Sequence, residues 1–182
     1  PGFRLVSAAV AAGIRVSPIP GCSAAIAAVS VAGLPTDRIL FEGFLPATES
    51  KRRTRLEALK ARTETLVLYE SAQRMPASLR DVIAVFGADR PVVAAREITK
   101  LHEIFYRGTA AEVLAQLGMD AGAGKGEYTV VIAGAPEAAP TNAELDRVLQ
   151  ALLGYLGVRQ SADVAAKILG VGRCGEVPVR LS

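Results

Sequence analysis

Apolar residues recur along this chain in two patterns, one with the spacing of helices and one in short runs typical of buried strands. Residues 3–13 have helical spacing and end at a glycine, and the segment 14–20, IRVSPIP, predicts a short strand. Ser23 is placed to cap a second helix, AAIAAVSVAG, which Gly33 closes. The first 35 residues therefore predict helix, strand and helix.

Strand-like and helical segments continue to alternate between residues 36 and 135. The last run, EYTVVIAGA, is apolar almost throughout, as expected for a strand in a sheet that is covered on both faces. Such alternation predicts an α/β layer domain with a mixed sheet. The expected strands are 38–46, 65–71, 91–99, 103–108 and 127–135, and the expected helices are 50–62, 75–87 and 109–118.

The chain beyond this domain changes character. Residues 136–142, PEAAPTN, predict a linker, and 143–157 and 161–170 predict two short helices that are too few to form a core of their own. We expect these helices to dock on the larger domain or to bind a partner. The small helical module thus spans 143–182 and ends in a glycine-rich tail, which we expect to be frayed.

With 51% hydrophobic residues among 182, the chain can bury a substantial core. Its longest apolar run is too short for a membrane span, which takes about 20 residues, so we expect no membrane contact. Cys22 and Cys174 lie far apart without a C-x-x-C spacing, which indicates neither a disulfide framework nor a zinc site. A reducing, cytoplasmic location fits best. The sequence begins at Pro1 with no signal segment, so we expect a cut N-terminus.

The net charge of +3 is modest, but it is unevenly distributed. Residues 50–62 hold six lysines and arginines against one glutamate, so one predicted helix carries a basic patch. Such a patch either binds RNA phosphates in a salt-dependent manner or is simply a solvated face. The cations that would contact phosphate are Lys51, Arg52, Arg53 and Arg55.

Polar groups gather near the ends of three predicted strands. PGCSAA, 20–25, would present the first backbone N–H groups of a helix at the sheet edge, although a simple capped helix start explains it as well. LVLYESAQR, 66–74, places Tyr69 and Glu70 at the same kind of edge. Ligands of open α/β sheets bind outside the carboxyl ends of strands, so these positions are candidates for a binding site. An ordinary strand-to-helix turn is the alternative.

AAREITKLHE, 94–103, is the third such end and is rich in ionisable side chains. Period-two alternation puts Arg96 and Glu97 on opposite faces, so one of them needs a partner or a ligand if the sheet is covered on both sides. A structural ion-pair cluster is the alternative. His102 is the only histidine and has no companion at helical spacing, so we expect no metal site.

These segments together carry a family resemblance. GFLP at 43–46, YESAQR at 69–74, AREITKLHE at 95–103 and KGE at 125–127 follow PGCSAA in this order. In this combination the chain resembles the tetrapyrrole-methylase superfamily, and within it the methyltransferases that modify the ribose 2′-hydroxyl of a cytidine in 16S ribosomal RNA. The matching stretches span most of residues 1–135.

The resemblance implies a homodimer in which two α/β domains enclose S-adenosyl-L-methionine. Residues 36–135 would then be the mixed-sheet second domain of this fold, and 1–35 a remnant of the first domain. The family's glycine-rich loop and Asp-Ala-Gly-Thr-Pro segment do not occur in this sequence. We therefore expect this 182-residue chain to be inactive on its own.

The same resemblance assigns roles to single residues. Glu97 or Glu127 would accept the hydroxyl proton or face the sulfonium cation, and Lys100 would hold a phosphate or the developing alkoxide. The residues that it places at the cofactor cleft are Pro20, Gly21, Ser23, Ala24, Tyr69, Glu70 and Gly126.

Two other functions remain open from the sequence. The chain could be a non-catalytic dimerisation and RNA-docking fragment, or part of a methylase for a tetrapyrrole precursor. The basic helix favours RNA over a porphyrin, since a polyanionic strand needs distributed cations. The final CGEVPVRLS does not fit the basic and aromatic last helix of the family.

Overall fold

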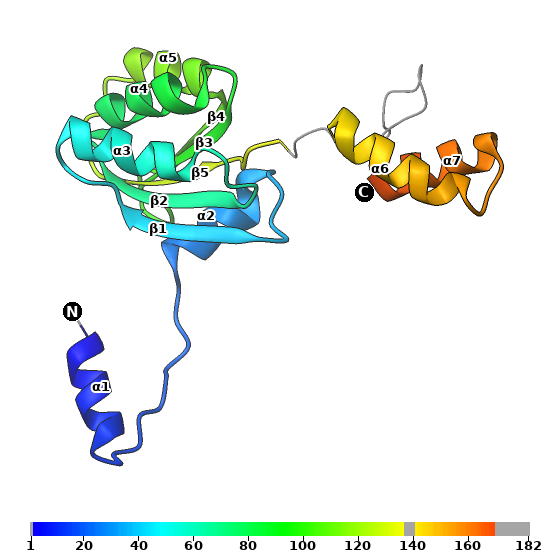
Figure 1. The fold of residues 1–182 in the computed structure, drawn as a ribbon. Helices are drawn as coiled ribbons and strands as arrows, with labels where there is room; N and C mark the ends of the chain where they lie inside the picture. Colours follow the sequence, from blue (N-terminus) through cyan, green and yellow to red (C-terminus); the bar gives the residue numbers. More distant parts are fainter. Residues whose placement is uncertain (1, 137–140, 170–182) are drawn as a thin grey trace. The chain divides into compact units, whose positions relative to one another are not determined.

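The computed structural model describes residues 2–136 and 141–169, which belong to two compact units, Pro1–Ala135 and Pro136–Ser182. Figure 1 shows the helices and strands of each unit. Within the described ranges, no helix is long and apolar enough to cross a membrane.

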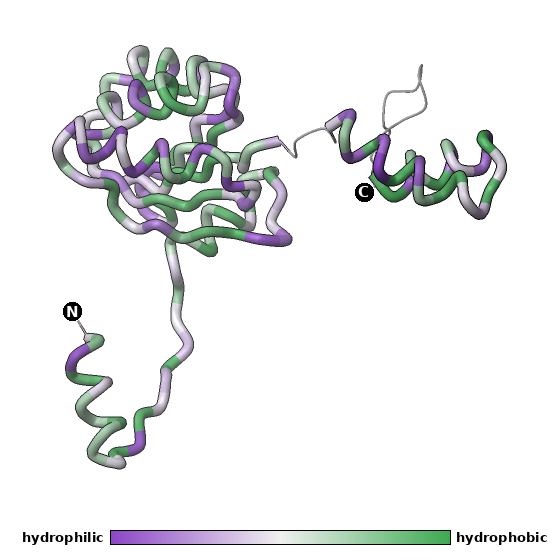
Figure 2. Tube along the Cα trace, in the orientation of Figure 1, coloured by the Kyte–Doolittle hydropathy of each residue, from purple (hydrophilic) through white to green (hydrophobic). Residues whose placement is uncertain are grey.

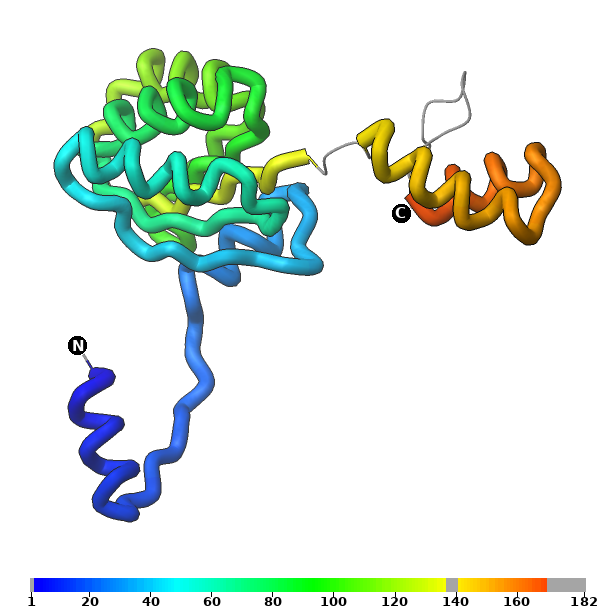
Figure 3. The backbone as a smooth tube through the Cα atoms, in the orientation of Figure 1, coloured from blue at the N-terminus to red at the C-terminus, as the bar shows by residue number. Residues whose placement is uncertain are grey.

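The first unit contains one five-stranded sheet. Its strands are β1 (Ile39–Phe44), β2 (Thr65–Ser71), β3 (Pro91–Arg96), β4 (Ile104–Thr109) and β5 (Glu127–Ile132). In the sheet they follow the order β1-β2-β5-β3-β4, with β1 and β2 parallel and all other neighbours antiparallel. This confirms the predicted mixed sheet. β5, the last strand among the described residues, lies in the middle of this order, and Figure 3 traces the path of the chain by residue number.

Helices cover both faces of this sheet (Figure 1). One face carries α3 (Glu49–Leu59), α4 (Met75–Phe86) and α5 (Ala110–Met119), and the other carries α2 (Ala24–Ala32). Alternate residues of a strand point to opposite faces, so Leu68 packs in the core under α3–α5 whereas Val67 packs against α2. The two covered faces explain the almost continuous apolar runs of the central strands.

The predicted strand at 14–20 does not form. No strand of the described residues pairs with this segment, and its side chains are exposed. An alternating sequence makes a strand only where a neighbouring edge supplies hydrogen bonds. α1 (Phe3–Ala11) does form as predicted, but none of its residues is buried. Figure 2 shows its mostly apolar colouring, so this part of the chain presents apolar side chains to solvent.

α2 lies before the predicted domain boundary at residue 35 and packs on the sheet, and the boundary itself stays a prediction. Ala28 and Ala32 of this helix are buried in one cluster with Val93 and Val131 of the strands. Small side chains allow a helix to approach a sheet closely, which accounts for the alanine-rich sequence of α2. α2 therefore belongs to the packed core of the sheet.

β3 ends at Arg96 instead of continuing to residue 99. Glu97 and Thr99 adopt positive φ angles of 51° and 63°, which a strand does not accommodate. The chain turns sharply at these residues and returns as β4, which pairs with β3.

The second unit contains two helices, α6 (Asn142–Leu153) and α7 (Val158–Leu169), close to the two that were predicted. Thr141 and Glu144 form a capping box at the start of α6. The two helices contact each other, and Ser161 and Ala165 of α7 are fully buried. The predicted frayed tail and part of the predicted linker lie outside the described residues.

A buried ion pair joins α3 to α4. Arg52 Nε lies 2.6 Å from Asp81 Oδ2, and Arg53 Nε lies 2.7 Å from Oδ1 of the same carboxylate. The side chains of Arg52 and Asp81 are only 6% and 3% exposed. Burial raises the pKa of Asp81, but the hydrogen bonds from Arg53 and Arg52 outweigh it and hold this pKa below its ordinary value. Arg52 thus acts as a structural cation in this fold, and its predicted contact with RNA phosphate stays a prediction.

Replacing Asp81 by Asn should lower the free energy of unfolding by about 3 kcal/mol at neutral pH, because the buried Arg52 loses its counter-charge. The ionised carboxylate stabilises the fold above the ordinary pKa of 3.8, and this contribution is lost as the pH falls through the depressed value. Urea unfolding near neutral pH and in acid measures both effects. The free energies of unfolding of Asp81→Asn and of the unmodified protein should converge in acid. Asp89→Asn, at an exposed position after the same helix, is the control. An equal loss in both variants would contradict the assignment.

Candidate functional site

A pocket of about 410 Å³ opens at one edge of the sheet, beside α2. Since β5 is antiparallel to both β2 and β3, the carboxyl ends of β2 and β3 and the start of β5 meet at this edge. The polar strand ends that the sequence analysis singled out are thus brought together. The lining includes Ala24, Phe44, Tyr69, Glu97, Lys100 and Glu127.

Three ionisable side chains form a cluster in this lining. Lys100 Nζ lies 2.9 Å from Glu97 Oε1 and 3.5 Å from Glu127 Oε2. Glu97 Oε1 also accepts a hydrogen bond of 3.0 Å from the backbone N–H of Glu127. Lys100 and this N–H lower the pKa of Glu97, and Glu97 raises the pKa of Lys100 in turn. With Glu127, the cluster carries an excess of one negative charge.

The backbone that carries Glu97 is strained. Among the described residues, Glu97 and Thr99 are the non-glycine residues with positive φ. The turn is held because Glu97 N donates to Glu127 O at 3.0 Å and Lys100 N donates to Glu97 O at 2.9 Å. Gly126 fits against it so closely that a Cβ there would lie 2.6 Å from the Glu97 side chain. Backbone strain of this kind clusters at functional sites, where the surrounding structure holds it in place.

Aromatic rings form the wall of the pocket beside β1. The ring centroid of Tyr69 lies 5.7 Å from that of Phe44 and 5.0 Å from that of Phe41. Phe44 is 65% exposed, so a flat apolar surface borders the opening. The sequence analysis missed both phenylalanines, because a β-bulge between Phe41 and Gly43 interrupts the alternation from which faces are predicted.

The predicted cofactor residues other than Glu70 fall into two groups. Ala24, the first residue of α2, lines the pocket together with Tyr69, and Gly126 contacts the Glu97 turn. The remaining ones are exposed in the segment before α2, and the Ser23 side chain makes no capping hydrogen bond within the described structure. Their contact with a cofactor stays a prediction; they are Pro20, Gly21 and Ser23.

Glu70 borders the pocket, but its carboxylate is directed to the opposite face of the sheet. It accepts a hydrogen bond of 2.5 Å from Ser78 Oγ on α4 and lies 3.2 Å from Arg74 Nε. Its side chain is 3% exposed, although Glu70 is among the residues that line the pocket, and its predicted contact with a cofactor stays a prediction. The alternation of a strand explains the direction of the carboxylate, because Tyr69 and Glu70 are neighbours and cannot share a face.

The side chains of Arg96 and Glu97 also lie on opposite faces of the sheet. Arg96 is buried on the α3–α5 side of the sheet, and its Nη1 lies 3.1 Å from Asp120 Oδ2. Tyr106 donates a hydrogen bond to the same carboxylate. The prediction that Arg96 or Glu97 needs a partner is confirmed for Arg96, and Asp120 is that partner.

The basic helix α3 is largely neutralised. Besides the pairs of Arg52 and Arg53 with Asp81, Arg55 binds Glu42 through two nitrogens at 2.6 to 2.9 Å. Lys51 is exposed and has no ion-pair partner in the described part of the chain. RNA contacts by Lys51, Arg53 and Arg55 stay a prediction.

His102 is exposed in the turn after β3. Within residues 2–136 and 141–169, no group of three or more histidine, cysteine, aspartate or glutamate residues is arranged to hold a metal ion.

Known proteins identify the family. The sequence profile described as Tetrapyrrole (Corrin/Porphyrin) Methylases matches residues 1–114. The chain belongs to this family. Among curated relatives of this chain, Ribosomal RNA small subunit methyltransferase I of Pseudomonas aeruginosa is 46% identical over 174 residues, which cover 94% of this chain and 62% of the relative. The proteins of the same name from Xylella fastidiosa and Escherichia coli O157:H7 are 45% and 43% identical, and 64% and 60% of their lengths are covered.

The chain thus spans about three fifths of the length of these relatives. Solved structures share the fold of this chain at low sequence identity. A putative diphthine synthase from Entamoeba histolytica superimposes with a TM-score of 0.53 at 16% identity, over 80% of this chain and 63% of that one. The methyltransferase CobJ gives 0.51 at 17% identity, over 73% and 57%. These likenesses support the α/β fold alone.

Replacing Gly126 by Ala should destabilise the protein by about 2 kcal/mol, because its φ of 87° and the nearby Glu97 side chain leave no room for a Cβ. Urea unfolding gives the free energy, and titration of Glu97 by carbon NMR shows whether the turn keeps its hydrogen bonds. Gly124→Ala is the matched control, since its Cβ meets no atom within 4 Å. Equal stability of the two variants would show that Gly126 does not shape the turn.

Proposed function

We propose that this chain is part of an S-adenosyl-L-methionine-dependent methyltransferase that modifies the 2′-hydroxyl of a cytidine ribose in 16S ribosomal RNA. The observation that carries the proposal is the convergence of the Glu97–Lys100 turn, Glu127 and Tyr69 on one pocket at the sheet edge. The names of the relatives support the same substrate class, because all three are methyltransferases of the small ribosomal subunit RNA.

The pocket has the chemistry that this methyl donor requires. S-adenosylmethionine supplies an activated methyl group on a sulfonium cation. The excess negative charge of Glu97 and Glu127 favours a cation nearby, and the aromatic and small apolar residues of the wall fit an adenosyl group. Ala24 at the start of α2 leaves the backbone at the pocket edge accessible.

The three charged residues take different parts in this proposal. The ribose oxygen forms a bond to the methyl carbon while the carbon–sulfur bond breaks and its electron pair goes to sulfur. Glu97 is engaged by Lys100 and the backbone of Glu127, so it acts by holding Lys100 in place. Lys100 faces the phosphate or the developing charge on oxygen. The Glu127 side chain is 84% exposed, which leaves its carboxylate accessible to accept the hydroxyl proton.

Several further assignments belong to the same proposal. The enzyme acts as a homodimer on the small ribosomal subunit in the cytoplasm. Residues 1–35 are the remnant of a first α/β domain, residues 36–135 form the second α/β domain, and a small helical module that contains α6 and α7 follows the linker. Catalysis comes mainly from orientation, because methyl transfer from a sulfonium needs little covalent chemistry from the protein.

Methyl transfer to small ribosomal subunits by the full-length protein tests the function. A 2′-O-methyl group protects the adjacent phosphodiester from alkaline cleavage, so the product should contain one alkali-resistant dinucleotide that begins with cytidine. Glu127→Gln should lower kcat about a hundredfold or more, whereas Glu57→Gln, on the exposed side of α3, should not. Methylation of a base, or transfer only to a tetrapyrrole precursor, would overturn the proposal.

Lys51 provides a separate test of RNA binding. If its exposed ammonium neutralises one phosphate, Lys51→Ala should reduce the slope of log affinity against log salt concentration by about 0.7 to 0.9. Filter binding over a range of salt concentrations measures the slope. Lys60→Ala, at the other end of the same helix, is the control for a general loss of charge. Equal changes in both variants would leave α3 without a specific phosphate contact.

A further inference from the structure

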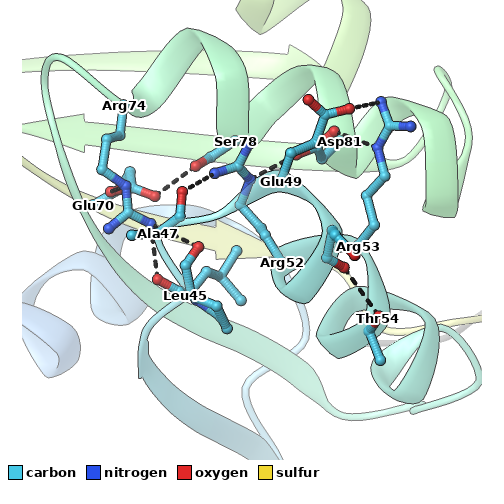
Figure 4. Close-up of polar contacts among 12 residues, drawn as sticks. Leu45, Ala47, Glu49, Arg52, Arg53, Thr54, Glu70, Arg74, Ser78 and Asp81 are labelled. Atoms are coloured by element: carbon cyan, nitrogen blue, oxygen red, sulfur yellow. Dashed lines mark hydrogen bonds and ion pairs between the residues drawn. The ribbon is translucent and has the colours of Figure 1, made fainter.

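The loop between β1 and α3 is held by guanidinium groups at three successive carbonyls. Arg74 Nη2 donates to the carbonyl oxygens of Leu45 at 2.8 Å and Pro46 at 3.2 Å. Arg52 Nη1 donates to the carbonyl oxygen of Ala47 at 3.1 Å. Figure 4 shows both arginines reaching this loop from the face of the sheet that α3 and α4 cover. Hydrogen bonds from charged donors are stronger than neutral ones, so these three constrain the path of the loop.

Each of these guanidinium groups is itself anchored by a buried carboxylate. Glu70 pairs with Arg74, and Asp81 pairs with Arg52. Ser78 of α4 donates to Glu70 and fixes the first of these carboxylates (Figure 4). Since Asp81 and Ser78 both belong to α4, the loop is attached through two ion pairs to one rigid helix.

This loop continues directly from the aromatic wall of the pocket. Phe44 precedes Leu45, and its ring packs beside Tyr69. Because Phe44 is more than half exposed, few packing contacts hold it, and its position depends on the backbone on either side. On one side lies the β-bulge at Gly43, where φ is 66°. On the other side lie the carbonyls that Arg74 holds.

We propose that Arg74 is a positioning residue for the pocket, which sets the place of Phe44 by clamping the carbonyls of Leu45 and Pro46. Arg52 extends the clamp by one residue. The inference rests on the proposed function in one respect, namely that the pocket receives the adenosyl group. Arg74 Nη2 donates to both carbonyls while Nε of the same group lies 3.2 Å from Glu70 Oε1, whereas lysine has a single nitrogen that does not span these positions.

The position of the loop can be measured without any ligand. The chain contains no tryptophan, so Phe44→Trp introduces a single fluorescent reporter at the pocket wall. In this background, Arg74→Lys keeps the charge beside Glu70 but loses the fork. We expect lower fluorescence anisotropy and stronger quenching by acrylamide in Arg74→Lys, with an almost unchanged melting temperature. Arg80→Lys, on the exposed side of α4, is the matched control and should change neither signal.

Ligand binding is measured separately, in the full-length protein with Phe44 retained. Calorimetry with S-adenosylhomocysteine should show about tenfold weaker binding in Arg74→Lys than in Arg80→Lys, because the loop must be ordered anew on binding. Arg74→Ala should bind no better than Arg74→Lys if it folds.

The outcomes separate the two proposals. An unchanged anisotropy in Arg74→Lys would overturn the clamp, and a mobile reporter with unchanged binding would overturn its role at the pocket. If the unmodified protein binds no S-adenosylhomocysteine, the proposed function fails, while the anisotropy still decides whether Arg74 positions the loop.

Discussion

Covering the sheet on both faces is the constraint that organises this structure. A side chain in a central strand points either into the core under α3–α5 or toward α2 and the pocket, and neighbours in sequence must go opposite ways. Ionisable residues at the strand ends therefore divide into two classes. Glu70 and Arg96 are paired in the interior, whereas Tyr69 and Glu97 face the pocket.

The same division gives each short motif a double role. In ARE-x-TK, Arg96 joins its strand to the loop that contains Asp120, while Glu97 and Lys100 form the ionic part of the site. In YES-x-x-R, Tyr69 forms part of the pocket wall. The charged residues of this motif, Glu70 and Arg74, hold the loop between β1 and α3. Each motif thus contains residues that hold the fold together and residues that line the pocket.

The order of elements and the meeting of strand ends could be predicted, because hydrophobic periodicity and glycine punctuation are local signals. The burial of individual charged side chains could not be predicted in this way. Arg52 sits in a run of cations that predicts a solvated face, yet its partner, Asp81, is far away in the sequence and on another helix. The segment 14–20 has strand character but gains no neighbouring edge, and the bulge before Gly43 changes which side chains share a face. Each of these depends on tertiary contacts that no local pattern contains.

The position of β5 has a consequence for how the molecule forms. The last strand of the chain separates β2 from β3, so the β1–β2 pair and the β3–β4 hairpin have no shared edge until β5 is inserted between them. During synthesis, the β1–β2 pair and the β3–β4 hairpin can join only after residues 127–132 have been made. The first of these residues, Glu127, also donates a backbone hydrogen bond to Glu97. The pocket is therefore completed only when β5 has been added between the two halves of the sheet.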